Sequence, residues 1–265
     1  MLKLLLKQLV VDTPIATLGQ RLRWIWRGPQ RIRHPELWDL YLEDRRIDLA
    51  LSALIGPGHN CVDVGAHIGS MLAEIRRLAP HGSHVAFEPV PYKARRLRRK
   101  FSDVAVIEAA TSEEPGTALF YDDIDRPGFS GLTRPVDESK VKSYEVRLVC
   151  LDIELASYDR IDFIKIDVEG AELSTLRGAD AILNRHRPAV LFECGTDVQL
   201  QRFGYKRVDL FDFFSERAYD VYSMVDFVYG RHPMSREGYE KAGTYPYGGF
   251  NYVALPVGSK VSRLL

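Results

Sequence analysis

The chain has 265 residues, 46% of them apolar, and carries as many Lys and Arg as Asp and Glu residues. This length accommodates one α/β domain with an extension, and this apolar fraction excludes wholesale disorder. A formal net charge of zero argues against a protein built mainly to bind nucleic acid. The three cysteines form no Cys-x-x-Cys pair, so we expect buried reduced thiols in a cytoplasmic protein.

The first 34 residues are basic, with seven Lys or Arg against one acid, and Trp24 and Trp26 lie among these charges. Their apolar run is too short, and too interrupted by Lys3 and Lys7, to span a membrane. A basic segment with tryptophans can lie on an anionic membrane surface, here the inner membrane face. The alternative is a helical arm that packs on the domain with a solvated basic face.

Helical spacing of apolar residues predicts one further helix at 34–54, which the sequence Gly56-Pro57-Gly58 ends. We therefore expect two parts in the chain. Residues 1–55 form an N-terminal helical extension, and residues 56–265 form the domain that carries the function.

The stretch at residues 60–71 predicts a ligand-binding turn. Residues 61–64 are expected to form a short buried strand, 65–69 a tight turn, and 70–78 a helix with one apolar face. Glycine lets a ligand approach the backbone, and the free N–H groups of the helix point at it. The candidate binding residues of this cradle are Asp63, Gly65, Ala66, His67 and Gly69. The alternative is a glycine turn that only reverses the chain.

The second strand, expected at 85–87, places Glu88 at its carboxyl end. Glu88 follows Gly69 by 19 residues, the usual length of one helix and one strand, so it can accept hydrogen bonds from ribose hydroxyls. A third strand is expected at 104–107, and Ala110 beyond it lies near the place of an adenine ring. The predicted ligand is therefore nucleoside-like.

A helix expected at 92–101 carries six basic residues. Such a run is either a solvated helix face or a surface for an anionic partner, such as a phosphorylated or lipid-linked substrate. Short strands are expected at 117–121 and 144–151. The polar stretch between them, at 122–140, is typical of a functional loop or lid.

A near-continuous apolar run predicts a buried parallel strand at 161–166, with Asp167 at its carboxyl end, where open α/β sheets bind ligands. Lys165 shares the side of the strand that Asp167 occupies. A buried lysine needs a charged partner, which Asp167 or Glu169 can supply. The alternative for Glu169 and Glu172 is that they stabilise the start of the next helix through its dipole.

The C-terminal third predicts a closing pair of strands. The remaining elements are expected at 171–185 (helix), 188–192 (strand), 203–217 (helix), 220–224 and 250–255 (strands). The strand at 188–192 leads to Glu193, again on the ligand edge. Because no helix is expected between the last two strands, they should be antiparallel and should close the sheet.

Four motifs stand out in the chain: Val-Asp-Val-Gly-Ala-x-Ile-Gly, Phe-Glu-Pro-Val-Pro, Ile-Asp-Phe-Ile-Lys-Ile-Asp-Val-Glu-Gly-Ala-Glu and Pro-Ala-Val-Leu-Phe-Glu. Over residues 60–256 the chain resembles the FkbM family of S-adenosylmethionine (SAM)-dependent O-methyltransferases. The resemblance implies a Rossmann-like methyltransferase fold, which is α/β with a mostly parallel seven-stranded sheet and an antiparallel closing strand. It also implies SAM as the cofactor, held by Asp63, Gly65, Gly69 and Glu88. The family commonly has Asn at the place of His67.

By the same resemblance, Asp167 and its neighbours face the methyl group, and the candidate catalytic residues are Asp167, Lys165, Glu169 and Glu193. Members commonly methylate hydroxyls of sugars or secondary metabolites. This implies a small-molecule, glycan or glycolipid acceptor and a role such as polysaccharide or glycolipid biosynthesis. Three tyrosines of the loop at 230–249 could stack on an acceptor sugar ring or simply pack the loop: Tyr239, Tyr245 and Tyr247.

An aliphatic hydroxyl is a very weak acid, so a carboxylate alone is a poor base for it. His67 could act as the base, although its place in the turn favours a structural role. Alternatively, Asp167 and Glu193 could share a Mg²⁺ or Mn²⁺ ion that binds the hydroxyl. Two other functions stay open: a catalytically silent SAM-binding module, and a nicotinamide-dependent oxidoreductase, which the turn spacing and the closing strand pair disfavour.

Overall fold

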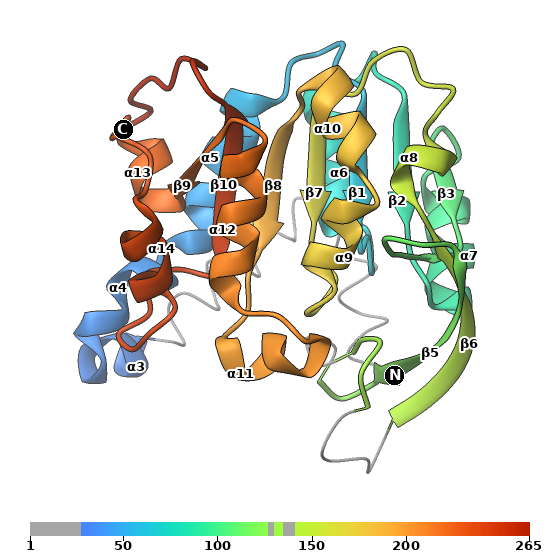
Figure 1. Ribbon diagram of the computed structural model, residues 1–265, viewed down its shortest axis with the longest axis horizontal. Coiled ribbons are helices and arrows are strands. Elements are labelled where there is room, and N and C mark those ends of the chain that lie inside the picture. The colour runs from blue at the N-terminus through green and yellow to red at the C-terminus, as the bar shows by residue number, and fades with distance from the viewer. Residues whose placement is uncertain (1–27, 127–129, 135–140) are drawn as a thin grey trace.

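The computed structural model describes residues 28–126, 130–134 and 141–265. Within these residues, seven strands form one sheet in the order β3-β2-β1-β7-β8-β10-β9 (Figure 1). The strands are β1 (Cys61–Val64), β2 (His84–Phe87), β3 (Ala105–Ile107), β7 (Phe163–Ile166), β8 (Ala189–Glu193), β9 (Tyr219–Ser223) and β10 (Asn251–Pro256). Strand β10 is antiparallel to both neighbours, whereas the other pairings are parallel. The predicted α/β fold and its closing antiparallel pair are confirmed. The expectation that no helix lies between the last two strands is wrong, because two short helices, Met224–Val228 and Arg236–Ala242, connect them.

Helices cover both faces of this sheet (Figure 1). They are α3 (Gly28–Arg33), α4 (Trp38–Tyr41), α5 (Glu43–Leu54), α6 (Ser70–Leu78), α7 (Pro91–Lys100), α8 (Leu151–Glu154), α9 (Glu172–Arg177), α10 (Asp180–His186), α11 (Asp197–Leu200), α12 (Arg207–Glu216), α13 (Met224–Val228) and α14 (Arg236–Ala242). The strand period of two decides which helices meet which side chains. Val62 and Val64 pack with α9, α10 and α12, while Cys61, which precedes them, packs with α5, α6 and α13 on the other face.

A second, three-stranded sheet stands beside the main one, in the order β4-β6-β5 within the described residues. It contains β4 (Ala110–Thr111), β5 (Gly116–Asp123) and β6 (Val141–Val149). The hairpin of β5 and β6 extends past the carboxyl edge of the main sheet (Figure 1). Strand β5 continues to Asp123, so the prediction of a loop from residue 122 is wrong there; Asp122 is buried in the strand as an ion-pair partner. Residues 127–129 and 135–140 of the expected lid lie outside the described residues.

The helix expected at 171–185 is two helices, α9 and α10, because the chain turns at Gly178. A Cβ atom at Gly178 would lie 2.2 Å from the carbonyl oxygen of Ser112, so the neighbouring loop needs a glycine there. The carboxylate of Asp152 then accepts hydrogen bonds from the N–H groups of Ala181 and Ile182 at 2.9 Å each. These contacts satisfy the free donors of a new helix start, which sequence periodicity does not reveal.

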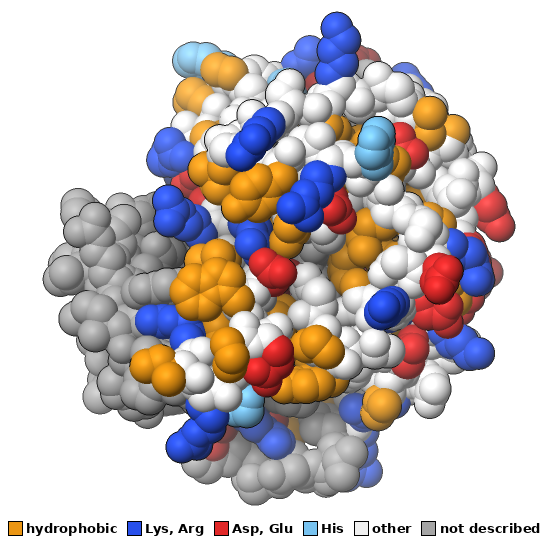
Figure 2. Space-filling model, turned by 90° about the vertical axis from the view of Figure 1, so that its left-hand side faces the viewer, with side chains coloured by type: hydrophobic (Ala, Val, Ile, Leu, Met, Phe, Trp, Pro, Cys, Tyr) orange, Lys and Arg blue, Asp and Glu red, His pale blue; other side chains and the backbone are white. Residues whose placement is uncertain are grey.

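The helix expected at 34–54 is likewise divided, into a short 3₁₀ turn (Pro35–Leu37), α4 and α5. The helix expected at 203–217 begins at Arg207, after α11 and a second 3₁₀ turn. Most of the basic arm at 1–34 lies outside the described residues. On the face drawn in Figure 2, hydrophobic side chains lie among charged ones of both signs. Among the described residues, no helix is long and apolar enough to cross a membrane.

Candidate active site

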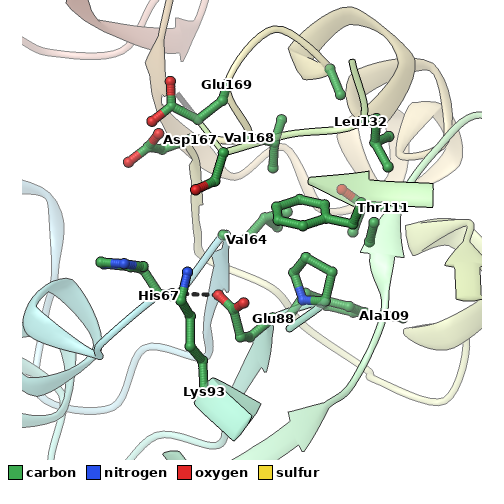
Figure 3. A pocket seen from close by; sticks show the side chains of 17 residues that line it. Val64, His67, Glu88, Lys93, Ala109, Thr111, Leu132, Asp167, Val168 and Glu169 are labelled. Atoms are coloured by element: carbon green, nitrogen blue, oxygen red, sulfur yellow. Dashed lines mark hydrogen bonds between the residues drawn. The ribbon is translucent and has the colours of Figure 1, made fainter. Parts of the chain in front are cut away.

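A large cavity lies at the carboxyl ends of β1, β2 and β7 and measures about 820 Å³, with the open solvent at its mouth included. Val64, Gly65, Glu88 and Asp167 line it from the main sheet, and Phe120 lines it from β5. In Figure 3, Asp167 and Glu169 lie on one side of this space, and Glu88 and Lys93 lie on the other. A cavity of this size suits a nucleoside-sized ligand.

The carboxyl group of Glu88 fixes the glycine turn. One oxygen accepts the backbone N–H of His67 at 2.8 Å, and the other accepts that of Val90 at 2.9 Å. The N–H groups of Gly65 and Ala66 both donate to the carbonyl of Phe87 at 3.0 Å. The turn is therefore held at the end of β2 by backbone hydrogen bonds as well as by the side chain of Glu88. Burial raises the pKa of Glu88 to about 7, although Lys93 and both backbone donors oppose that shift.

The glycines of the turn serve close packing as well as its shape. Gly65 has φ +78°, and a Cβ atom there would lie 1.9 Å from the carbonyl oxygen of Asp167. Gly69 has φ +82°, and its Cβ would lie 2.4 Å from the ring of Phe101. Both positions therefore exclude other residues for two reasons, the left-handed backbone and the contact. Gly65 in particular lets the end of β7 approach the turn.

His67 occupies the turn with a positive φ of 49°, which is uncommon for a residue with a side chain. Its Nε2 atom is buried and has no hydrogen-bond partner among the described residues. Burial, together with the charge of Lys93, lowers the pKa of His67 to about 4. The ring is therefore neutral at pH 7 and a weak base.

Lys165 connects two carboxylates across the sheet. Its Nζ lies 3.3 Å from an oxygen of Asp63, its neighbour on β1, and 3.4 Å from an oxygen of Asp167. It also donates to the carbonyls of Val64 and Gly65 at 3.3 and 3.0 Å. Burial alone would lower the pKa of Lys165, but the attraction of Asp167 and Asp63 is larger, so the pKa of Lys165 is raised. The ammonium is thus a fixed charge that holds Asp167 beside the turn.

Three further acids surround Asp167. Burial and the charges of Asp167 and Glu172 raise the pKa of Glu169 to about 9. The pKa of Glu193 is also well above its usual value, because it is buried beside Asp167 and shares a hydrogen bond with it. Glu172 is different, because it accepts the N–H groups of Val168 and Gly170 at 3.2 and 3.1 Å and so shapes the loop before α9. At pH 7 the cluster therefore places a neutral Glu169 carboxyl group, which can donate a hydrogen bond, next to Asp167.

The predicted residues therefore divide by location. Those that line the cavity are Gly65, His67, Glu88, Ala110, Asp167 and Glu169. Those that are not among its lining residues are Asp63, Ala66, Gly69, Lys165 and Glu193. Asp63 is fully buried against Lys165, which places its carboxylate in the sheet. Tyr239 is also fully buried, so it cannot stack on an acceptor, whereas Tyr245 is 59% exposed.

Sequence reasoning missed Lys93, which lines the cavity although it belongs to the basic run of α7. Lys93 is 3% exposed and its Nζ lies 2.8 Å from Asp122, so it is no part of a solvated face. It also missed Phe120 and Leu132, which close the cavity from the second sheet and the segment after it. The one sequence signal that distinguishes Lys93 from the other basic residues of this helix is its position in the first turn, close after Glu88.

The residues of the metal hypothesis, Asp167 and Glu193, do come together. Among the described residues, however, no group of three or more His, Cys, Asp or Glu side chains is arranged to hold a metal ion. Lys165 already compensates the charge of Asp167 at 3.4 Å. The donor set is thus poor for Mg²⁺, which prefers several oxygen ligands in an octahedron.

Comparison with known proteins agrees with this geometry. The chain is similar to "Methyltransferase sdnD" of Sordaria araneosa, with 31% identity over 158 residues, 45% of this chain and 60% of that protein. It is also similar to "Methyltransferase 1" of Beauveria bassiana (strain ARSEF 2860), with 29% identity over 145 residues, 45% of this chain and 57% of that protein. The chain thus spans less than two thirds of the length of these curated relatives.

Among solved structures, the methyltransferase FkbM from Methylobacillus flagellatus KT is 18% identical, with a TM-score of 0.47 over 76% of this chain and 44% of that one. The strand order described above, with one reversed strand, is that of SAM-dependent methyltransferases and implies SAM as the cofactor. The family described as "Methyltransferase FkbM domain" matches residues 63–221, which include the turn, Glu88 and the acid cluster. The chain therefore belongs to the FkbM methyltransferase family.

Proposed function

We propose that the protein transfers the methyl group of SAM to a hydroxyl oxygen of a small-molecule, glycan or glycolipid acceptor. The observation that carries this proposal is the carboxylate of Asp167, which lies in the cavity at the carboxyl end of β7 with the ammonium of Lys165 3.4 Å away. An oxygen nucleophile must lose a proton, and a positioned carboxylate can accept it.

The cavity fits the cofactor in its residues as well as its size. The carboxyl oxygens of Glu88 each accept one backbone N–H, which leaves lone pairs for ribose hydroxyls. Ala109, Ala110 and Phe120 line an apolar part that suits a flat base. Bound SAM supplies an electrophilic methyl group on a sulfonium.

The acids then divide the remaining work. The acceptor hydroxyl donates a hydrogen bond to Asp167, which orients the oxygen lone pair. As the new carbon–oxygen bond forms, the oxygen becomes strongly acidic, so a carboxylate is a sufficient base late in the reaction. Glu193 shares a hydrogen bond with Asp167, and the raised pKa of Glu193 favours its protonated form as the donor. Glu169, which is neutral at pH 7 and lies on the same side of the cavity as Asp167, can donate a hydrogen bond to an acceptor oxygen.

Two observations favour Asp167 over His67 as the base. The pKa of His67, lowered to about 4, makes it no stronger a base than a carboxylate. His67 also has its backbone N–H committed to Glu88, which supports a structural role in the turn.

The test compares wild-type protein with Asp167→Asn, which keeps the size of the side chain but removes its charge. With an acceptor found in a panel of hydroxyl compounds, we expect the rate to fall about 100-fold or more, while SAM affinity in calorimetry changes little. Product NMR should show the methyl group on oxygen. Near wild-type turnover would return Asp167 to a structural partner of Lys165.

The same assay separates the remaining alternatives. Turnover that EDTA abolishes and Mg²⁺ or Mn²⁺ restores would support a metal between Asp167 and Glu193; EDTA-resistant turnover would leave direct carboxylate assistance. SAM binding without methyl transfer to any acceptor class would favour a catalytically silent module. A methylated nitrogen or carbon in the product would overturn the proposed oxygen acceptor.

A further inference from the structure

We propose that a second, basic recess between the glycine turn and α7 binds a compact anion, such as a phosphate group, beside the cofactor. The recess is shallow, about 240 Å³ with the open solvent at its mouth included, and is lined by His67, Ile68, Lys93, Arg96, Leu97 and Lys100. It lies next to the main cavity and shares His67 and Lys93 with it. Its chemistry differs, because three of its six lining residues are cationic and none is acidic.

One positive charge of the recess, that of Arg96, has no carboxylate partner among the described residues, whereas Lys93 is paired with Asp122. Arg96 is half-buried and forms no ion pair with any described residue. Elsewhere on the same helix, Arg98 pairs with Glu108 at 2.9 Å, which shows that acids within reach of α7 do form pairs. A guanidinium left without a carboxylate in a concave surface favours binding of an oxyanion, to which it can donate two parallel hydrogen bonds.

Lys93 gives the recess a fixed floor. Its side chain is 3% exposed, and its Nζ lies 2.8 Å from an oxygen of Asp122, which is 1% exposed. Tyr92 donates to the other oxygen of Asp122 at 3.1 Å, which holds the pair in place. An ammonium has three donors and only one is directed at Asp122, so the group can serve a second partner. A preorganised charge of this kind binds an anion with less loss of side-chain entropy than a mobile surface lysine.

His67 supplies an independent observation. Its buried Nε2 has no hydrogen-bond partner among the described residues, a costly state for a polar atom. An anion in the recess would provide one. The charged groups that act on the ring are Lys93 and Lys165, which lower its pKa, and Asp167 and Asp122, which raise it. An added anion would therefore raise the pKa of His67 from about 4.

The recess and the cofactor cavity lie on either side of the same turn. The backbone N–H of His67 holds Glu88, while its ring borders the recess. An anion there would brace the wall that holds the cofactor and should bind together with it. The phosphate could be free or could belong to a phosphorylated acceptor, because both present the same oxyanion to Arg96.

The experiment uses the full chain and inorganic phosphate as the probe. Isothermal titration, and NMR of labelled histidine, should show saturable phosphate binding with a shift of the His67 signals. Arg96→Gln should weaken the binding about 10-fold or more, the effect of removing a charged donor. The matched control, Arg99→Gln, changes an exposed arginine of the same helix outside the recess and should leave binding within about 2-fold. Thermal unfolding of both variants checks that the fold is retained.

Two further arms decide where the anion belongs. Saturation with S-adenosylhomocysteine should leave phosphate binding intact; competition would mean that the recess accepts the carboxylate of the cofactor, and would overturn a separate site. A monosaccharide phosphate that binds more tightly than phosphate, while the neutral sugar does not bind, would assign the site to a phosphorylated acceptor. Equal losses in both arginine variants, or no saturable binding, would show a solvated basic face. Phosphate binding is measured without methyl transfer, so the result for the recess remains valid even if the proposed function is wrong.

Discussion

At the scale of single residues, Glu88 has a structural role in addition to its proposed contact with the cofactor. The sequence indicates an acid for ribose hydroxyls at the end of β2. The structure adds that the same carboxyl group holds the turn, by accepting the N–H groups of His67 and Val90. Truncation of Glu88 to alanine would disturb the turn that lines the cavity as well as any contact with the cofactor. Glu88→Gln keeps the size of the side chain and is therefore the sharper test. We expect it to weaken SAM binding by about 1–3 kcal/mol.

The titration of Glu88 gives a prediction for the protein without cofactor. Burial raises its pKa to about 7, above the ordinary value of 4.5, so the folded state binds the proton more tightly than the unfolded state. The stability from this proton is complete below pH 4.5 and is lost as the pH rises through 7. The unfolding free energy of wild type relative to Glu88→Gln should therefore fall by about 3 kcal/mol between pH 5 and 8.

Urea unfolding of both proteins across that range measures the difference. Glu169 and Glu193 titrate in both proteins and cancel in the comparison. Parallel pH profiles would show that Glu88 does not change protonation in this window.

At the scale of elements, the hairpin of β5 and β6 depends on one buried ion pair. Lys93 of α7 and Asp122 of β5 are 3% and 1% exposed, and the pair fixes the strand that carries Phe120 over the cavity. Such a pair contributes little net stability compared with apolar side chains, but breaking it leaves one charge buried alone. The pair therefore acts on the position of the hairpin more than on the overall stability.

We expect Asp122→Asn to destabilise the protein by about 3–5 kcal/mol, because the Lys93 ammonium stays buried without its carboxylate. The matched control is Arg98→Gln, which breaks the exposed pair of Arg98 with Glu108 and should cost less than about 1 kcal/mol. Chemical denaturation measures both. Equal costs for the two variants would contradict the structural role of the buried pair.

At the scale of the whole molecule, α5 is part of the domain core. Ala50 and Leu51 of α5 are buried in one apolar cluster with residues of α6, β7 and β10. Glu43 at its start accepts the N–H groups of Phe250 and Asn251 at 2.8 and 3.0 Å, which ties the helix to the start of β10. None of the described residues before α5 is buried in this cluster, so we expect a truncation at His34 to leave the fold intact.

That truncation tests the membrane hypothesis for residues 1–34. If the basic arm binds an anionic surface, the full chain should pellet with anionic liposomes at low salt and be released at high salt, because screening weakens the attraction. A protein that begins at His34 should stay in the supernatant at both salt concentrations. Identical sedimentation of the two proteins would leave the arm only a packing role.

The sequence by itself determined the elements whose signals are local. The strand Cys61–Val64, its glycine turn and the helix Ser70–Leu78 follow from a short apolar run, two glycines and helical periodicity, and the structure has them at those residues. The acids at the carboxyl ends of β2, β7 and β8 were also readable, because parallel strands bring their ends to one edge. Motif spacing therefore located the cofactor edge and the acid cluster.

Tertiary structure alone decided which charged side chains are buried and what they meet. Lys93 and Arg96 belong to one basic run, yet Lys93 is buried against Asp122 from a strand 29 residues away, while Arg96 remains unpaired among the described residues. The helix at 171–185 divides because Asp152, from another element, provides a second helix start. Burial and pairing depend on contacts between distant segments, and the desolvation of a charge is decided by those contacts, which no local pattern encodes.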